Sequence, residues 1–182
     1  MKDNQTTELR GIIETAAPDE SIKKSFLERI ERGAITKDEN PENHFCVYFA
    51  AFDPKEKMVF IGHHKKSGLW LFNGGHMDRD ETPLQSLRRE VGEEWGKNVE
   101  IKNIPAPSLL TITEIENRPV QACRRHYDVW FFMPAVKDHF EPDEKLLATE
   151  FYQNGWKTLK EASDLIKDPG TLIALDYLGK IL

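Results

Sequence analysis

The sequence has little of what marks secreted, membrane-spanning or disulfide-stabilised proteins. Its 182 residues include only two cysteines, Cys46 and Cys123. Both neighbour strand-like segments, so two reduced thiols are expected rather than a disulfide. The first residues form no apolar signal segment, and no run reaches the ~18 apolar residues that a membrane helix needs. These absences predict a cytoplasmic protein that spans no membrane.

The sequence also lacks an excess of positive charge. Lys and Arg total 25 against 31 Asp and Glu, which gives a net charge of -6 at pH 7. A negative chain is poorly suited to broad binding of nucleic acid or of anionic membrane surfaces, so neither is expected as a partner. The length suits one domain with a sizeable core, and the sequence shows no internal repeat or low-complexity segment.

The hydrophobic pattern alternates along the chain between helical and strand-like periods. Helices are expected over residues 7–15, 18–33, 82–95, 158–166 and 170–181. Strands are expected over residues 44–52, 58–63, 69–72, 99–101, 109–115, 125–133 and 151–156. Loops are expected at 73–76 and 134–142. A linker at 40–43 divides the chain into an N-terminal helical extension, residues 1–40, and a larger domain, residues 41–182.

A glycine loop followed by a glutamate-rich helix is the most informative part of the chain. Thr82, Pro83 and Gln85 form a helix start, with Thr82 as N-cap and Gln85 completing a capping box. The apolar residues that follow recur every three or four positions and predict one buried stripe. They are Leu84, Leu87, Val91 and Trp95.

Three glutamates, Glu90, Glu93 and Glu94, lie together on the flank of that stripe, at about 100° per residue on a helical wheel. Each neighbouring pair of like charges costs a few tenths of a kcal/mol, and a bound cation would turn this repulsion into attraction. A solvated acidic helix face, bridged by Arg89, is the simpler alternative. The paired glycines just upstream favour a metal site, because a glycine backbone can approach a ligand closely.

The expected metal is Mg²⁺ or Mn²⁺, because the candidate ligands all supply oxygen. The sequence contains neither a Cys-x-x-Cys pair nor a His-Glu-x-x-His motif, so zinc is not expected. His63 and His64 are adjacent on an expected strand and point to opposite faces, so they are not expected to share one ion. Gly92 costs about 1 kcal/mol relative to Ala in mid-helix, and close backbone packing is one explanation for it.

The spacing of these residues resembles the signature of a known family. The stretch reads Gly75-x5-Glu81-x7-Arg89-Glu90-Val91-Gly92-Glu93-Glu94-Trp95-Gly96. This is similar to the Nudix box, Gly-x5-Glu-x7-Arg-Glu-U-x-Glu-Glu-x-Gly-U, in which U is aliphatic. Only the last position differs, since Lys97 replaces an aliphatic residue. The resemblance implies an α/β fold, a Nudix-type α/β/α sandwich with a mixed sheet, for the Nudix hydrolase domain at residues 41–182.

The resemblance also implies an activity, that of a pyrophosphohydrolase using Mg²⁺ or Mn²⁺. Its substrate would be a small-molecule phosphoanhydride, such as a nucleoside diphosphate derivative or a nucleotide. The implied metal ligands are the Gly74 carbonyl and the side chains of Glu90, Glu93 and Glu94. Glu93, Glu94 and Arg89 are the catalytic candidates, with Arg89 orienting the carboxylates and Glu93 acting as third ligand or base.

Other residues outside the box are candidates for the base and for substrate contacts. Some family members take the base from elsewhere, and the candidates here are Glu114, Glu116, Glu141, Glu144 and Glu150. Substrate contacts are expected from His76, Arg125, Tyr127 and Phe72, although strand aromatics more often pack in a core. Many relatives have proline in place of Asn73, so a less rigid loop is expected.

Two other functions remain open from the sequence. A Nudix-like binding or regulatory module usually lacks box carboxylates, which this chain keeps. An isopentenyl diphosphate isomerase of this fold needs a catalytic cysteine, for which Cys46 is the candidate, but the surrounding residues do not match that motif. The oligomeric state is also open, and a homodimer is compatible with the N-terminal helices.

Overall fold

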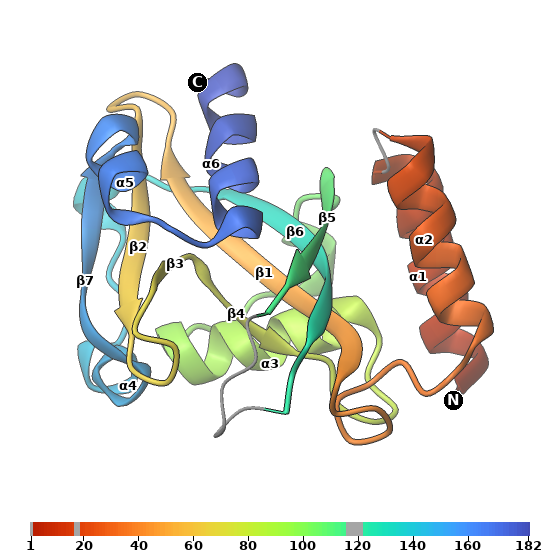
Figure 1. The fold of residues 1–182 in the computed structure, drawn as a ribbon. Helices are drawn as coiled ribbons and strands as arrows, with labels where there is room; N and C mark the ends of the chain where they lie inside the picture. The colour runs from red at the N-terminus through yellow and green to blue at the C-terminus, as the bar shows by residue number, and fades with distance from the viewer. Residues whose placement is uncertain (1, 17–18, 116–121) are drawn as a thin grey trace.

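The computed structural model describes residues 2–16, 19–115 and 122–182, and within them a seven-stranded mixed sheet lies between helical layers (Figure 1). The helices are α1 (Lys2–Ala16), α2 (Glu20–Glu31), α3 (Pro83–Trp95), α4 (Glu144–Glu150), α5 (Leu159–Leu165) and α6 (Pro169–Ile181). The strands are β1 (Asn43–Asp53), β2 (Met58–His64), β3 (Trp70–Leu71), β4 (Asn73–His76), β5 (Leu109–Glu114), β6 (Arg125–Pro134) and β7 (Phe151–Thr158). Short 3-10 turns are η1 (Ile101–Asn103) and η2 (Lys137–His139). This arrangement confirms the expected α/β sandwich with a mixed sheet.

Strand β1 runs through the centre of the sheet. It pairs in parallel with β6 along its length, whereas all other strand pairs among the described residues are antiparallel. The other edge of β1 is divided, since β4 pairs with its middle, residues 46–49, and β2 with its last two residues. The glycine segment thus becomes a strand inside the sheet, and the loop expected there was wrong.

The two faces of β1 explain the layers. Phe45, Val47 and Phe49 point to one face and join a core that includes residues of α1, α2, α3 and α4. Ala50 lies on the other face, in a second core with residues of α5 and α6. Because a strand buried on both faces is apolar almost throughout, the even-numbered positions of β1 and β6 that remain polar are informative.

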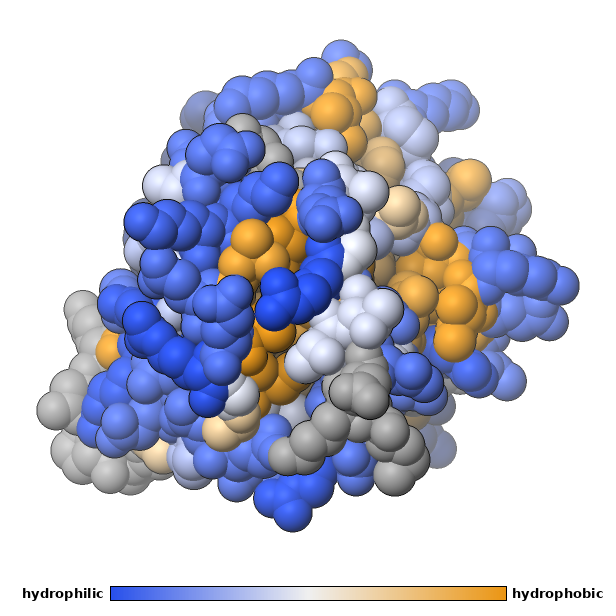
Figure 2. All heavy atoms as spheres, turned by 90° about the vertical axis from the view of Figure 1, so that its right-hand side faces the viewer, coloured by the Kyte–Doolittle hydropathy of each residue, from blue (hydrophilic) through white to orange (hydrophobic). Residues whose placement is uncertain are grey.

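The two N-terminal helices lie side by side against the first of these cores (Figure 1). The Phe26 ring of α2 meets Phe45 and Tyr127 edge-on, at centroid distances of 5.6 and 5.3 Å. Arg29 is buried and donates to the backbone carbonyls of Gly33, Ala34 and Asn43. The outer surface on this side is mostly hydrophilic, with hydrophobic side chains between (Figure 2). The division at residue 40 stays a prediction.

Most expected elements are confirmed. Both capping boxes are present, at Thr82 and Thr158, and Cys46 and Cys123 are buried free thiols. Helix α2 begins after the N-cap Asp19, while Pro18, its expected first residue, lies outside the described residues. None of the helices in the described part of the chain is long and apolar enough to cross a bilayer.

Two further expectations were wrong for local reasons. Residues 99–101 form no strand but lead into η1, and the prolines at 105 and 107 that follow cannot donate to a sheet. No helix was expected at α4, because only Leu147 among its seven residues is buried and the segment has no apolar stripe to indicate one. Asp143 caps it by accepting hydrogen bonds from the backbone of Lys145 and Leu146.

Candidate active site

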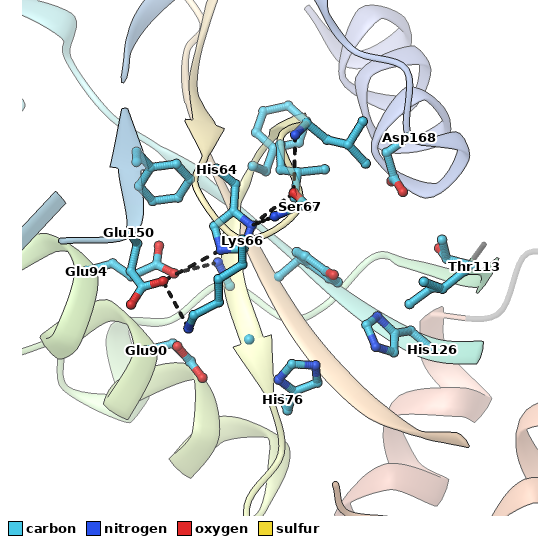
Figure 3. Close-up of a pocket in the computed structure, with 18 of the residues that line it drawn as sticks. His64, Lys66, Ser67, His76, Glu90, Glu94, Thr113, His126, Glu150 and Asp168 are labelled. Atoms are coloured by element: carbon cyan, nitrogen blue, oxygen red, sulfur yellow. Dashed lines mark hydrogen bonds and ion pairs between the residues drawn. The ribbon is translucent and has the colours of Figure 1, made fainter. Parts of the chain in front are cut away.

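A cavity of about 770 Å³ opens where α3 meets the sheet. This volume lies within the ~300–1,000 Å³ typical of small-molecule sites. Its wall includes all three box glutamates and the end of β4, namely Glu90, Glu93, Glu94, Gly74, Gly75 and His76. In Figure 3 the labelled Glu90, Glu94 and Glu150 lie on one side of the cavity, and His126, Thr113 and Asp168 on the other.

Helix α3 holds its glutamates in a defined orientation. Its capping box sets the first turn, and the buried stripe of Leu87, Val91 and Trp95 fixes the rotation of the helix against the core. Glu90 and Glu94, one turn apart, are consequently only 8% and 6% exposed. Glu93 also borders the cavity, but its side chain is 60% exposed.

The two buried carboxylates have too little positive charge around them. Burial raises the pKa of Glu94 to about 8, although hydrogen bonds from the Asn73 side chain and the Gly74 backbone act in the opposite direction. Burial likewise raises the pKa of Glu90, against the effect of neighbouring Arg89. A divalent cation between them would favour the ionised form of both.

Arg89 connects the carboxylates of the box. One of its terminal nitrogens donates to Glu90 at 2.7 Å and to Glu93 at 3.2 Å, and Nε donates to Glu81 at 3.0 Å. The other terminal nitrogen donates to the backbone carbonyl of His76 at 2.9 Å. Burial lowers the pKa of Arg89, but Glu81 and Glu90 more than compensate and raise it. Arg89 therefore stays charged and positions the box against β4.

The paired glycines allow β4 to lie directly against these carboxylates. Gly74 has a φ of +144°, and a Cβ there would lie 2.3 Å from the carbonyl oxygen of Val47. A Cβ on Gly75 would lie 2.2 Å from Oε1 of Glu90. Both positions therefore require glycine. Together with an all-oxygen donor set, this close approach fits a hard divalent cation.

Asn73 has a role that the sequence did not indicate. It lies in β4 opposite Phe49, is buried, and its side-chain amide donates to Glu94. A proline at this position would have no such donor. Asn73 thus ties the strand to a metal-ligand candidate, while the expected lower rigidity relative to proline stays a prediction.

The structure brings only part of the predicted substrate set to the cavity. Phe72 and His76 border it, and Phe72 also packs edge-on against Trp130 in the second core. Tyr127 packs with the first core, and Arg125 pairs with Glu114. Both border a separate cavity of about 450 Å³ beside α2. Odd-numbered residues of β6 face away from the glutamates, which explains the separation.

Their position relative to the cavity decides which glutamates outside the box can act as the base. Glu114 and Glu150 border the cavity, whereas Glu141 and Glu144 do not; Glu116 lies outside the described residues. Glu150 Oε2 lies 3.3 Å from Lys66 Nζ and 3.6 Å from His64 Nε2 (Figure 3). Glu150 is thus held on the same side of the cavity as Glu94.

Sequence reasoning missed the basic residues of the cavity. Lys37, Lys66 and Lys167 border it although they come from three separate loops. No local pattern connects these positions, so only the fold brings them together. Three ammonium groups beside the glutamates suit a substrate that carries several negative charges.

Three imidazoles form the wall behind β4. Burial lowers the pKa of His44 to about 4, of His126 to about 3 and of His76 to about 2. All three are therefore neutral at pH 7. His63, by contrast, stacks on Trp70 at the sheet edge.

Close backbone packing was one expected explanation for the glycine at position 92. It was wrong, because a Cβ on Gly92 would meet only the Lys97 carbonyl, at 3.9 Å. We expect Gly92→Ala to raise the free energy of unfolding by about 1 kcal/mol, because alanine is the better helix former. Urea unfolding measures the change. The control is Gly96→Ala, which should destabilise, since Gly96 has a φ of +65° and a Cβ there would lie 2.9 Å from Asp143. A destabilising Gly92→Ala would contradict the expected gain and would show that the position does need glycine.

Comparison with known proteins agrees with this geometry. A family model for the NUDIX domain matches residues 24–175. The fold is similar to that of an E. coli dihydroneopterin triphosphate pyrophosphohydrolase, at 18% identity over 73% of this chain and 92% of that one, with a TM-score of 0.52. A MutT protein of Methanosarcina mazei Go1 is similar at 17% identity over 76% of this chain and 92% of that one, with a TM-score of 0.52. A MutT from a study of Aliivibrio salmonicida and Vibrio cholerae is similar at 15% identity over 78% of this chain and 100% of that one, with a TM-score of 0.52.

At these identities the solved structures support the fold alone. A search of curated proteins found no match.

Proposed function

The chain belongs to the Nudix family, and we propose that it is a pyrophosphohydrolase dependent on Mg²⁺ or Mn²⁺. It would cleave a diphosphate linkage in a nucleoside diphosphate derivative or a nucleotide, releasing a phosphorylated product. One observation carries the proposal: two buried carboxylates with raised pKa values, Glu90 and Glu94, face a cavity that three lysines also border. Such a site suits a metal-bound phosphoanhydride.

The metal would be held by residues of α3 and β4. Glu90, Glu93 and Glu94 offer carboxylate oxygens, and Gly74 offers a backbone carbonyl. A bound Mg²⁺ or Mn²⁺ would neutralise phosphate charge and lower the pKa of water. Arg89 keeps the carboxylates in place through its hydrogen bonds to Glu90 and Glu93.

Two carboxylates are suited to take the proton from the attacking water. Glu93 is exposed beside the other ligands, and Glu150, the last residue of α4, borders the same cavity. We propose Lys37, Lys66 and Lys167 as phosphate contacts, because their charge is opposite to that of the substrate. His76 and Phe72 are proposed substrate contacts from the same wall, whereas the proposal does not depend on Arg125 or Tyr127.

The geometry favours hydrolysis over the two alternatives. Cys46 is 1% exposed and burial raises its thiol pKa, so it is a poor catalytic acid for an isomerase. A silent binding module has no need for two buried carboxylates whose pKa values stay raised despite the Arg89 pair with Glu90 and the hydrogen bonds to Glu94. For the remaining properties we propose a cytoplasmic protein with no nucleic-acid or membrane partner, with homodimerisation as an arrangement to test.

A panel of diphosphate compounds tests the proposed function. Nucleoside diphosphate sugars, dinucleotides and nucleoside triphosphates are incubated with Mg²⁺, with Mn²⁺ or with a chelator, and the products are separated by chromatography. Dihydroneopterin triphosphate belongs in the panel, because one structural neighbour is named for it. We expect turnover of one substrate class that the chelator abolishes. Tight binding of one compound without turnover would overturn the proposal in favour of a binding module.

A further inference from the structure

Three histidines and a cysteine converge on the sheet face next to the candidate active site. They are His44 on β1, His76 on β4, His126 on β6 and Cys123, two residues before β6. One potential ligand atom from each lies within 4.8 Å of all the others. We propose that these four side chains bind a zinc ion, at a site separate from the hard cations of the glutamates, although His76 also borders the cavity of the proposed hydrolysis.

The spacing of the four groups is close to that of a tetrahedral site. The imidazole centroids form a nearly regular triangle with sides of 4.8, 4.9 and 5.1 Å. Cys123 Sγ lies 3.8 Å from Nε2 of His44 and 3.7 Å from Nε2 of His76. In a tetrahedral zinc site with ordinary bond lengths, neighbouring ligand atoms are ~3.3–3.6 Å apart. Small side-chain rotations are therefore enough to close the site.

One of the proposed ligand side chains has a buried nitrogen with no hydrogen-bond partner in the described part of the protein. His126 is only 6% exposed, and its Nε2 finds no hydrogen-bond partner among the described residues. Buried polar atoms are nearly always paired, so an unpaired imidazole nitrogen in a group of four close ligand side chains is suited to bind an ion.

The surroundings of His44 have the form expected for a zinc ligand. Its Nδ1 lies 2.9 Å from the backbone carbonyl of Asn40, which can only accept, so Nδ1 carries the proton. The lone pair of Nε2 then faces Cys123. Zinc-bound histidines commonly donate their second nitrogen to a backbone carbonyl in this way, which fixes the ring and its tautomer.

His76 requires one local change. Its Nδ1 lies 3.3 Å from Lys37 Nζ, and coordination through Nε2 would place a proton on Nδ1. Lys37 must then move away, and its exposed position gives it room. The donor set of three nitrogens and one thiolate is typical of zinc and unsuited to Mg²⁺.

The proposed site would fix the strand that carries the glycines. Its ligands join β1, β4, β6 and the segment before β6, and His76 directly follows Gly75. Because protein ligands would fill all four positions, zinc would stabilise this wall rather than activate water. Zinc was not expected from the sequence, because the ligands at positions 44, 76, 123 and 126 form no recognised local motif.

Cobalt substitution tests the assignment on the full-length chain. Protein stripped with a chelator is titrated with Co²⁺, whose tetrahedral thiolate complexes give strong visible bands and a sulfur-to-metal band in the near ultraviolet. We expect both at about one equivalent, displaced by Zn²⁺ but not by excess Mg²⁺. Cys123→Ser should lose the sulfur band, whereas Cys46→Ser, at the other buried thiol, should keep it.

Two further measurements keep the test decisive if Cys123→Ser does not fold. Wild-type protein dialysed against excess Mg²⁺ should retain about one zinc per chain by elemental analysis. Glu94→Gln should lose hydrolysis yet keep the cobalt spectrum, which separates this proposal from the proposed function. Wild-type protein without tetrahedral cobalt bands would overturn the site. A sulfur band lost in Cys46→Ser and kept in Cys123→Ser would overturn the ligand set.

Discussion

Glu94→Gln is expected to lower kcat for metal-dependent hydrolysis by roughly 10³-fold or more, a loss in the upper range for removing an essential acid–base or ligand group. Glu94 is the most buried of the box carboxylates and accepts hydrogen bonds from Asn73 and Gly74. Glutamine keeps the size of the side chain. Its single amide oxygen can accept from the Gly74 backbone, and its amide nitrogen can donate to the Asn73 side chain once that amide turns over. The substitution removes only the negative charge, which is the property that a metal ligand needs.

The measurement is initial rate against metal concentration, on the best substrate of the diphosphate panel. Glu141→Gln is the matched control, because this glutamate lies on the surface outside the cavity, and its rate should equal that of wild type. Circular dichroism verifies that both variants keep the native fold. A folded Glu94→Gln protein with the wild-type rate would contradict the metal-site assignment.

The same substitution is expected to stabilise the metal-free protein at pH 8. Burial raises the pKa of Glu94 from its ordinary value of 4.5 to about 8. Between these pH values the folded protein binds more protons than the unfolded chain, so stability falls as the pH rises. By pH 8 the penalty is on the order of a few kcal/mol, and glutamine removes it.

Urea unfolding in a chelator at pH 5 and at pH 8 measures this effect. The stability advantage of Glu94→Gln should be large at pH 8 and nearly absent at pH 5. Glu93→Gln provides the control, because its exposed carboxylate should change stability little at either pH. Adding Mg²⁺ at pH 8 should stabilise wild type and leave Glu94→Gln unchanged. If Glu94→Gln were less stable than wild type at pH 8, the buried charge of Glu94 would not be destabilising, which would contradict the prediction.

The parts of the site that the sequence predicts are those whose residues all lie in one short segment of the chain. The N-cap at Thr82, the stripe ending at Trp95 and the flank that carries the glutamates all follow from helical spacing. Strand β4 does not, because glycine disfavours strands and only the pairing with β1 makes this segment one. The hydrogen bond from Asn73 to Glu94 depends on that pairing in turn.

Strand β6 illustrates a second limit. Its residues from His126 to Phe132 are all buried, so alternation does not show which face meets the glutamates. The prediction placed Arg125 and Tyr127 at the site, whereas the register places His126 there and turns those two residues toward α2. Residues brought together from distant segments, such as the three cavity lysines, are visible only in the fold.

Binding of Mn²⁺ tests most directly the central claim that the buried glutamate pair holds a hard divalent cation. Electron paramagnetic resonance of free Mn²⁺ gives its affinity for wild type, Glu94→Gln and Glu141→Gln, with the zinc content of all three held equal. Wild type and Glu141→Gln should bind with the same affinity, which should tighten as the pH rises toward 8 because Glu94 loses its proton. Glu94→Gln should bind at least about tenfold more weakly, a loss of about 1.4 kcal/mol. Equal Mn²⁺ affinity in all three proteins would contradict the claim.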